Sequence, residues 1–418
     1  MHSPAGPSAP RSVILLVGTL AAIYLVSQFL RNSVGVIAPD LAAEIGLNAG
    51  EIGLLSSAFF LAFAAAQIPL GVALDRYGPK RCMLVCAVVA FFGTLAFAAA
   101  TTPAGLVTAR ILMGLGSSCY LMAPLALYAR RFPPERFAAL AGIQMAIGTI
   151  GTLLVTAPLA WASAEFGWRA TFLFVAAIVV IGAALVAIVV REGTEDARPV
   201  ETLRQSLAGV IDVARMRGFW PIFLMNCVGY SSYVLIVGLW GGPYLAHVYG
   251  YDLATRGELL MLPAVSQIVG VVLWGQAERI TGSHRRLVLA GALATAAALG
   301  LLAALGKPDP WVLTAWLAVF GFCPAFLPVL IAHGRSFLPP PLLGRGMTLF
   351  NIGSMGGTFV VQLLSGVLIN LFPAQGGAYP LEAYRAVFAV QAASILVACA
   401  TYGTSKAGVA RPQPSRTN

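Results

Sequence analysis

Long apolar runs of about 20 residues, nearly free of charge, recur along the whole chain and restrict what it can fold into. A run of this kind crosses a bilayer as an α-helix, whereas the strands of a membrane barrel alternate in polarity and are about half as long. Charged residues make up only 10% of the 418 residues, apolar residues 59%, and the mean hydropathy is +0.84. A water-soluble surface needs about a quarter charged residues. The sequence therefore predicts an all-α integral membrane protein.

Twelve membrane-spanning helices are predicted. They cover 13–38, 52–74, 82–101, 104–128, 137–162, 169–190, 218–244, 256–278, 286–306, 310–332, 344–371 and 383–404. The longest connection is charged and mixed in sign, and it is expected to include an amphipathic helix over 200–215. The expected division is a disordered tail (1–12), a first half (13–191), a linker (192–216), a second half (217–405) and a second tail (406–418).

Lysine and arginine are distributed unevenly between the two sets of loops. With the N-terminus placed inside, the inner segments hold 20 of the 26 basic residues and the outer loops hold four, while Arg31 and Arg110 lie within spans. Basic loops stay on the cytoplasmic side. We therefore predict a bacterial inner-membrane protein with both termini in the cytoplasm. The net charge of +10 is explained by these loops, so no nucleic-acid partner is expected.

An internal repeat appears when the chain is compared with itself. A shift of 204 positions aligns Pro39 with Pro243, Gly46 with Gly250, Gly53 with Gly257, Gly71 with Gly275 and Gly78 with Gly282. Later in the chain the shift grows to 216, where "WRATF" at 168–172 meets "YRAVF" at 384–388. Two parallel six-helix halves are the design of a rocking transporter whose substrate site lies between them.

The stretch "GVALDRYGPKR" resembles the loop between the second and third helices of the major facilitator superfamily. The matching residues are Gly71, Asp75, Arg76, Gly78, Lys80 and Arg81, and "GQAERITGSHRR" from 275 resembles a degraded second copy. The resemblance implies that fold, transport by alternating access, and a gating role for this loop, with Asp75 holding the halves together in one state. We expect the two glycines to allow close helix contact and a tight turn.

Arg31 and Arg110 are the two charged side chains expected inside spans, at a similar depth of roughly 10–12 Å below the outer boundary. A buried charge of this kind usually faces a water-filled cavity. Tyr24, Gln28 and Arg31 share one helix face. Other candidates for substrate contact are Asn226, Tyr230 and Tyr233 in the seventh span and Asn351, Thr358 and Gln362 in the eleventh.

A cationic cavity without a matching acid selects anions, because arginine grips a carboxylate or phosphate through two hydrogen bonds. Each candidate also has a structural alternative. Arg31 can reach toward the outer surface, Arg110 can bond the backbone near the glycines that follow it, and neutral polar residues can join neighbouring helices.

The stretch "FLRNSVGVIAPDLAAEIGL" resembles helix 1 of the anion–cation symporters, the organic-anion branch of the superfamily. In that branch an Asp-Arg pair precedes Asn, whereas here Leu30 stands in the place of the acid before Arg31 and Asn32. The resemblance implies an organic anion as cargo. A coupling proton would then travel on the substrate carboxylate or use Asp40 or Glu278, unless there is no proton coupling.

The fifth span lacks the Gly-Pro of the family's antiporter motif, because Val155 and Thr156 stand at those positions, and this disfavours efflux.

We find no metal-ligand cluster, nucleophile–base pair or phosphate-binding loop, so neither an enzyme nor a cofactor is expected. The prediction is a monomeric secondary transporter that takes up a small organic anion. The alternatives are a carrier of a neutral or aromatic nutrient such as a vitamin, an efflux pump, and a membrane sensor that does not transport.

Overall fold

The computed structural model describes residues 10–191, 203–216, 218–339 and 342–404, and these form helices with one isolated β-bridge between Gln375 and Ala378. Most of the two predicted tails and the start of the linker lie outside the described residues. Eleven helical segments in the described part are long and apolar enough to cross a membrane, and one bent pair brings the number to twelve. The prediction of an all-α membrane protein with twelve spans is confirmed.

The first half and the linker contain ten helices. They are α1 (Pro10–Asn32), α2 (Val34–Ile45), α3 (Ala49–Tyr77), α4 (Pro79–Ala99), α5 (Pro103–Ser117), α6 (Met122–Arg131), α7 (Pro134–Leu154), α8 (Ala157–Phe166), α9 (Trp168–Val189) and α10 (Leu203–Ala214). The bent pair is α7 and α8, which meet at 43°. Helix α10 lies within the range expected for the linker helix.

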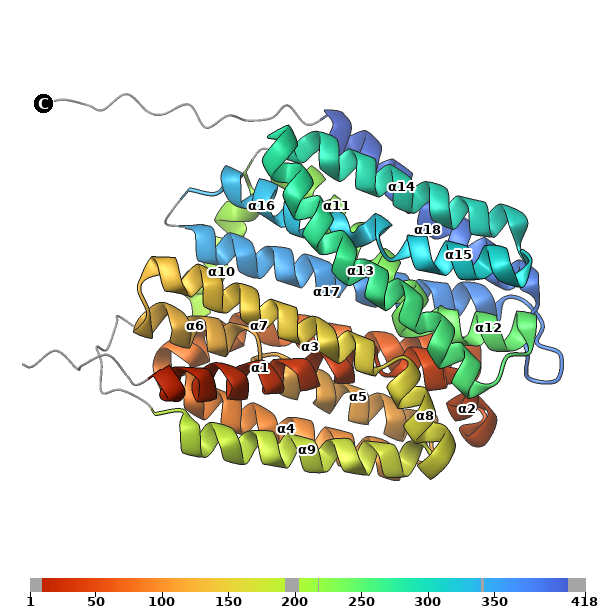
Figure 1. The fold of residues 1–418 in the computed structure, drawn as a ribbon, viewed down its shortest axis with the longest axis horizontal. Helices are drawn as coiled ribbons and strands as arrows, with labels where there is room; N and C mark the ends of the chain where they lie inside the picture. Colours follow the sequence, from red (N-terminus) through yellow and green to blue (C-terminus); the bar gives the residue numbers. More distant parts are fainter. Residues whose placement is uncertain (1–9, 192–202, 217, 340–341, 405–418) are drawn as a thin grey trace, which may run out of the picture.

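The described residues of the second half form α-helices and short segments of other helical types. They are α11 (Phe219–Leu235), the π-helix η1 (Ile236–Trp240), α12 (Gly241–Tyr249), α13 (Leu253–Thr281), α14 (His284–Leu305), α15 (Pro310–Phe320), the 3-10 helix η2 (Cys323–Phe326), α16 (Leu327–Phe337), α17 (Leu343–Asn370) and α18 (Leu381–Thr404). Figure 1 shows the first half in red to yellow-green and the second half in green to blue.

The two halves pack their helices in the same pattern. Helix α1 contacts α7 and α9, just as α11 contacts α17 and α18. Helix α4 lies against α9 as α14 lies against α18, and α3 lies against α5 as α13 lies against α15. The parallel repeat expected from the sequence is therefore present in the packing.

Five predicted spans are interrupted; four of the interruptions follow the same repeat, and the fifth is the bend between α7 and α8. The first span turns at Ser33 and continues as α2, while the seventh passes through η1 at the equivalent position. The fourth breaks between α5 and α6, and the tenth breaks at η2. The apolar pattern of these spans did not predict the positions of the breaks. The predicted end of the first span at 38 was wrong for this reason, since α2 runs on to Ile45.

The turns at equivalent positions also match. Gly46 and Gly250 end α2 and α12 in the left-handed conformation, with φ of 79° and 70°. Asn48 then caps α3, and Asp252 caps α13 by accepting a hydrogen bond from the backbone of Thr255. Hydrogen bonds from Thr255 lower the pKa of Asp252, which lies in a loop between two spans.

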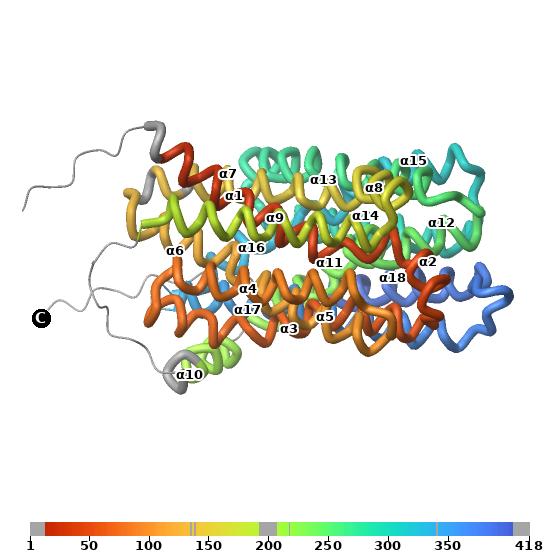
Figure 2. The backbone as a smooth tube through the Cα atoms, turned by 90° about the horizontal axis from the view of Figure 1, so that it is seen from below, coloured from red at the N-terminus to blue at the C-terminus, as the bar shows by residue number. Residues whose placement is uncertain are grey.

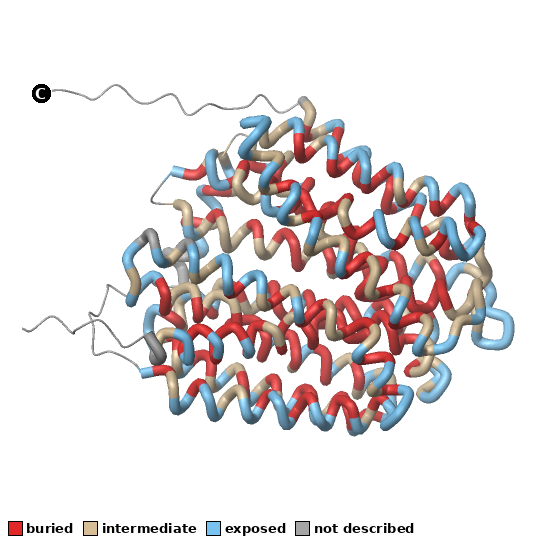
Figure 3. Tube along the Cα trace, in the orientation of Figure 1, coloured by how far each residue is buried: buried red, intermediate tan, exposed pale blue. Residues whose placement is uncertain are grey.

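The molecule has two distinct ends. The start of α1, the end of α18 and α10 lie at one end, the linker end, and α2, α8 and α12 lie at the other, the distal end (Figure 2). Buried residues concentrate inside the bundle, and exposed residues follow the outer faces (Figure 3). Large apolar side chains such as Phe174 and Ile188 on α9 are exposed there, as a lipid-facing surface requires.

Candidate substrate site between the halves

Arg31 lies deeper in the bundle than its position in the sequence suggested. Helix α2 extends fourteen residues beyond it to Ile45, about 20 Å of helical rise. The Arg31 side chain is 6% exposed, and its guanidinium carbon lies 4.7 Å from the ring centre of Phe63, in the middle of α3. The alternative in which Arg31 reaches the outer surface is therefore wrong, because the residue is buried at the centre of the bundle.

Arg31 connects the two halves and keeps part of its hydrogen-bonding capacity. Its Nη1 donates to the hydroxyl of Tyr230 on α11 at 3.1 Å. Its Nε is buried without a partner, and its Nη2 makes no hydrogen bond with any described residue. The Nε–Nη2 edge of the guanidinium, which is the geometry that grips a carboxylate, thus makes no hydrogen bond within the described part of the protein.

Arg110 is fully buried and its hydrogen bonds are made to backbone. Its Nη1 donates to the carbonyl of Leu30, and its Nη2 donates to the carbonyl of Arg31 at 3.1 Å. These carbonyls lie at the end of α1, where the turn at Ser33 interrupts the helical hydrogen bonds. Arg110 therefore stabilises the negative end of α1, which is the backbone role that the sequence left open beside substrate contact.

Two stacked phenylalanines support the two arginines. The rings of Phe59 and Phe63 lie one turn apart on α3, with centres 6.2 Å apart and an angle of 22° between their planes. The guanidinium of Arg110 lies 4.6 Å from the centre of the first ring, and Arg31 lies over the second. Cations bind favourably over aromatic faces. Sequence analysis could not single out these residues, because aromatic side chains are common in apolar spans.

The predicted face of α1 is brought to the half-to-half interface. Tyr24 is buried, with its ring against Gly148 of α7, and lies within electrostatic reach of both Arg31 and Tyr230. Gln28 packs along the same face, and its Oε1 has no partner. On α11, Tyr233 is buried with an unpaired hydroxyl. The structure thus places Tyr24, Arg31 and Tyr230 together.

The predicted amides contribute mainly to packing between helices. Asn226 donates from Nδ2 to the carbonyl of Phe350 at 2.6 Å and to the hydroxyl of Ser354 at 2.8 Å, which joins α11 to α17. Asn351 donates to Oε1 of Gln67 on α3 at 3.0 Å, so this bond joins the two halves. Sequence reasoning missed Gln67, although a glutamine inside an apolar span is a signal that could have identified it.

The two remaining candidates on α17 lie toward the distal end. Thr358 is fully buried and donates to the carbonyl of Ser354 at 2.8 Å. Gln362 is also fully buried, and neither of its amide atoms has a partner. Its backbone lies against Gly53 of α3, where a Cβ would clash. Close packing of the two halves at this point depends on the glycine.

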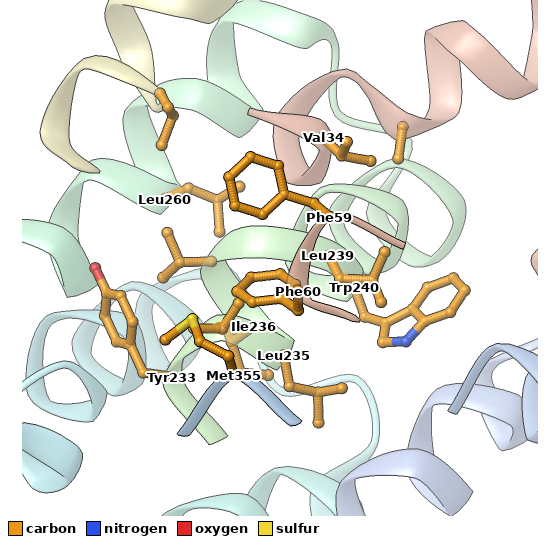
Figure 4. Packing of buried hydrophobic residues seen from close by; sticks show 14 of the residues in the cluster. Val34, Phe59, Phe60, Tyr233, Leu235, Ile236, Leu239, Trp240, Leu260 and Met355 are labelled. Atoms are coloured by element: carbon orange, nitrogen blue, oxygen red, sulfur yellow. The ribbon is translucent and has the colours of Figure 1, made fainter. Parts of the chain in front are cut away.

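The distal end is closed by apolar side chains from both halves. Figure 4 shows this group, which includes Val34, Phe59 and Phe60 from the first half and Ile236, Leu239, Trp240, Leu260 and Met355 from the second. Gly35 of α2 lies directly against the backbone of η1, and Gly242 of α12 lies against the backbone of Gly35. A side chain at either glycine would overlap the opposite half.

One ion pair at the distal end joins the two halves. Nη2 of Arg256 on α13 lies 2.9 Å from Oδ2 of Asp40 on α2, and the Arg256 side chain is only 4% exposed. The hydroxyl of Tyr379 also crosses between the halves, accepting from the backbone amide of Ala49 at 2.8 Å. The sequence placed Arg256 in an outer loop, so its burial and its partner were not expected.

The loop motif at the linker end makes its described contacts within the first half. Gly78 forms the expected turn, with φ of 82°. Asp75 lies 3.5 Å from Arg130 on α6, and Nζ of Lys80 donates to the carbonyl of Ala187 on α9 at 2.7 Å. The expected close helix contact at Gly71 is wrong, because a Cβ there would meet no atom within 4 Å and the residue is on an exposed face.

The other two residues of the motif are basic and lie beside the turn. The Arg76 guanidinium lies 5.4 Å from the ring centre of Tyr77, and Arg81 belongs to the first turn of α4. Neither position tests whether the loop gates transport. The gating role of the motif stays a prediction.

Comparison with known proteins gives a consistent family. The profile of the Major Facilitator Superfamily matches residues 20–332 and 243–417. A protein of Agrobacterium vitis named for tartrate transport is 24% identical over 90% of this chain and 91% of its own length. The probable sulfoacetate transporter of Cupriavidus necator is 24% identical over 62% of this chain, and the match spans 64% of that relative. A chloramphenicol resistance protein of Streptomyces lividans is 27% identical over 88% of this chain and 84% of its own length.

A solved structure supports the same assignment at the level of the fold. The crystal structure of a bacterial homologue of the human lysosomal transporter Spinster has a TM-score of 0.76. The alignment covers 96% of this chain and 97% of that chain at 19% identity. With the family profile spanning nearly the whole sequence, this chain belongs to the Major Facilitator Superfamily and is a multi-pass membrane transporter, not an enzyme.

Proposed function

We propose that this transporter carries a small organic anion across the bacterial plasma membrane by alternating access, with Arg31 as the residue that binds the anion. The observation that carries this proposal is the environment of the Arg31 guanidinium. It is a buried cation at the interface of the two halves, and among the described residues it has no acidic partner and no hydrogen bond at one edge of its guanidinium. A ligand with a negative charge would stabilise such a buried cation more than a neutral ligand would.

The neighbouring residues support an anion over a cation. Leu30 stands where the anion–cation symporters have an acid, and its side chain is fully buried. The described acids closest to the interface lie at the ends of the molecule, with Asp40 paired to Arg256 and Asp75 to Arg130. A cationic substrate would therefore meet Arg31 without a compensating carboxylate.

Two relatives also support an organic anion, since tartrate and sulfoacetate both carry negative charges. A second candidate is efflux of a neutral aromatic compound, which the relationship to the chloramphenicol resistance protein favours. We prefer uptake of an anion, because a buried arginine has little use for a neutral cargo and the antiporter Gly-Pro is absent from the fifth span.

The proposed cycle uses the two ends of the molecule in turn. We assign the linker end to the cytoplasm, because the basic loops lie there, so the closed distal end faces outward. The halves 13–191 and 217–405 would rock about Arg31, and the loop motif from Gly71 to Arg81 would hold the linker end closed in the opposite state. A coupling proton, where one is used, would travel on the substrate carboxylate, and the working unit is a monomer.

The test is a thermal-shift screen of the purified full-length protein against carboxylates, sulfonates, phosphate esters and vitamins. A ligand at one hundred times its Kd stabilises the folded state by about 2.7 kcal/mol. We expect at least one organic anion to raise the melting temperature of the wild type but not of Arg31→Ala. Arg31→Lys keeps the positive charge but cannot donate two parallel hydrogen bonds to a carboxylate. It should therefore retain part of the shift in melting temperature. Stabilisation by neutral compounds alone, unchanged in Arg31→Ala, would contradict the proposal.

A further inference from the structure

We propose that the substrate is an aromatic monocarboxylate and not a dicarboxylate. This inference rests on the proposed function, because it assumes that Arg31 binds the carboxylate. It goes further by using the residues around Arg31 to define the rest of the ligand. Two properties of the site lead to it: one cation whose Nε–Nη2 edge makes no hydrogen bond, and aromatic neighbours.

The site offers one cation for direct pairing. Arg110 is fully buried, donates to two carbonyls, and offsets the negative end of α1, so its charge already has a partner in the backbone. Arg256 is paired with Asp40 at the distal end. Among the described arginines that are buried within the spans, only Arg31 has an Nε–Nη2 edge that makes no hydrogen bond at all, since Arg110 has its Nε unpaired but donates from Nη2. A second carboxylate would be desolvated without a partner, which is unfavourable.

The surroundings of Arg31 are aromatic. One face of its guanidinium lies over Phe63, and Nη1 bonds the hydroxyl of Tyr230. Tyr24 is buried on the same face of α1 as Arg31. A carboxylate held at the Nε–Nη2 edge would place the rest of the molecule among tyrosine and phenylalanine rings, which favour an aromatic partner by offset or edge-to-face packing.

The test compares three ligand classes on the same full-length protein in detergent. Benzoate, phenylacetate and 4-hydroxybenzoate represent aromatic monocarboxylates, galactonate represents sugar acids, and tartrate represents dicarboxylates. Titration calorimetry with the wild type and Arg31→Ala gives the Kd of each. We expect at least one aromatic monocarboxylate to bind about tenfold or more tightly than tartrate, with loss of that binding in Arg31→Ala.

The outcomes separate the two proposals. If galactonate or tartrate binds in an Arg31-dependent manner and the aromatic acids do not, the anion site stands and the aromatic inference is overturned. If none of the anions binds, or if binding is unchanged in Arg31→Ala, both the anion site and the inference built on it are overturned.

A matched pair of variants at Tyr230 tests the aromatic contact. Tyr230→Phe keeps the ring without its hydroxyl, whereas Tyr230→Ser keeps a hydroxyl without the ring. We expect Tyr230→Phe to retain the preference for aromatic monocarboxylates over tartrate and Tyr230→Ser to reduce it several-fold. Circular dichroism of both variants checks that they fold, and wild-type preference in a folded Tyr230→Ser variant would contradict the inference.

Discussion

The distal end and the linker end differ in how the two halves meet. At the distal end α2 packs against α12 and η1, and α8 packs against α13, with Gly35 and Gly242 in direct contact with the opposite backbone. The ion pair of this end is buried on the Arg256 side and joins the halves. At the linker end the pair Asp75–Arg130 is exposed and lies within one half. The contacts that must break for the distal end to open are therefore of a different kind from those of the loop motif.

This difference identifies which residues set the state of the transporter. Apolar packing and glycine contacts supply most of the closure at the distal end, because they exclude water and leave no space for a side chain. The exposed pair at the linker end is screened by solvent and contributes little. Substitutions at the two ends should therefore have very different effects.

The largest effect is expected at Gly35. In Gly35→Val the new side chain would overlap the backbone of Val237 and Gly238, so the distal end could not close and transport should be abolished. A cysteine at Leu239, buried in the closed end, should then become reactive toward a membrane-impermeant maleimide in a background without native cysteines. Gly18→Val on α1 is the matched control, since its Cβ meets nothing within 4 Å and it lies outside the proposed gating motif. Equal labelling in both variants would refute this explanation.

The next largest effect is expected at the distal ion pair. Asp40→Asn leaves the buried Arg256 without its counter-charge, which should disfavour the closed distal end by about 1–3 kcal/mol, less than a fully buried pair because Asp40 is 38% exposed. The double variant Asp40→Asn/Arg256→Gln should recover part of the loss. A double-mutant cycle on maleimide accessibility measures the coupling, and strictly additive effects would show that the pair does not act as a unit.

A smaller effect is expected where α3 and α17 meet. Asn351→Ala removes the hydrogen bond to Gln67 between the halves, with an expected loss of about 1 kcal/mol. Gln67→Ala should give a similar loss, and the double variant should cost less than the sum. Melting temperatures of the four proteins test this, and an unchanged melting temperature in both single variants would rule out the bond as a stabilising contact.

The smallest effect on stability is expected at the linker end. Asp75→Asn removes an exposed pair at 3.5 Å, worth at most about 1 kcal/mol. The same variant tests the proposed gating role, because a gate that acts in the other state should lose transport without losing stability. Paired uptake and melting measurements separate these effects, and normal uptake in Asp75→Asn would contradict the gating role.

The sequence predicted the architecture well, because the bilayer imposes the length and polarity of each span on local residues. The twelve spans, the repeat and the turn at Gly78 all follow from such local constraints. The breaks at Ser33 and η1 could not be predicted in this way, since they depend on contacts between the halves. The cause is the approach of Gly35 to the backbone of η1, two segments about two hundred positions apart.

The candidate site was predicted only in part for the same reason. A charge inside an apolar run is a local signal, and it identified Arg31 and Arg110 equally. Only the structure distinguishes them, because Arg110 donates to the carbonyls of Leu30 and Arg31 while one edge of the Arg31 guanidinium is open. Gln67 and Arg256 acquire their roles from partners in the other half, which no local pattern contains.

The central claim is that Arg31 binds the anion that is transported. The most direct test is uptake of the tightest-binding carboxylate into proteoliposomes by the wild type, Arg31→Ala and Arg31→Lys, with reconstitution checked by protein content. We predict saturable uptake by the wild type, reduced uptake by Arg31→Lys and none by Arg31→Ala. Uptake by Arg31→Ala at the wild-type rate would show that the anion is bound elsewhere and would contradict the account.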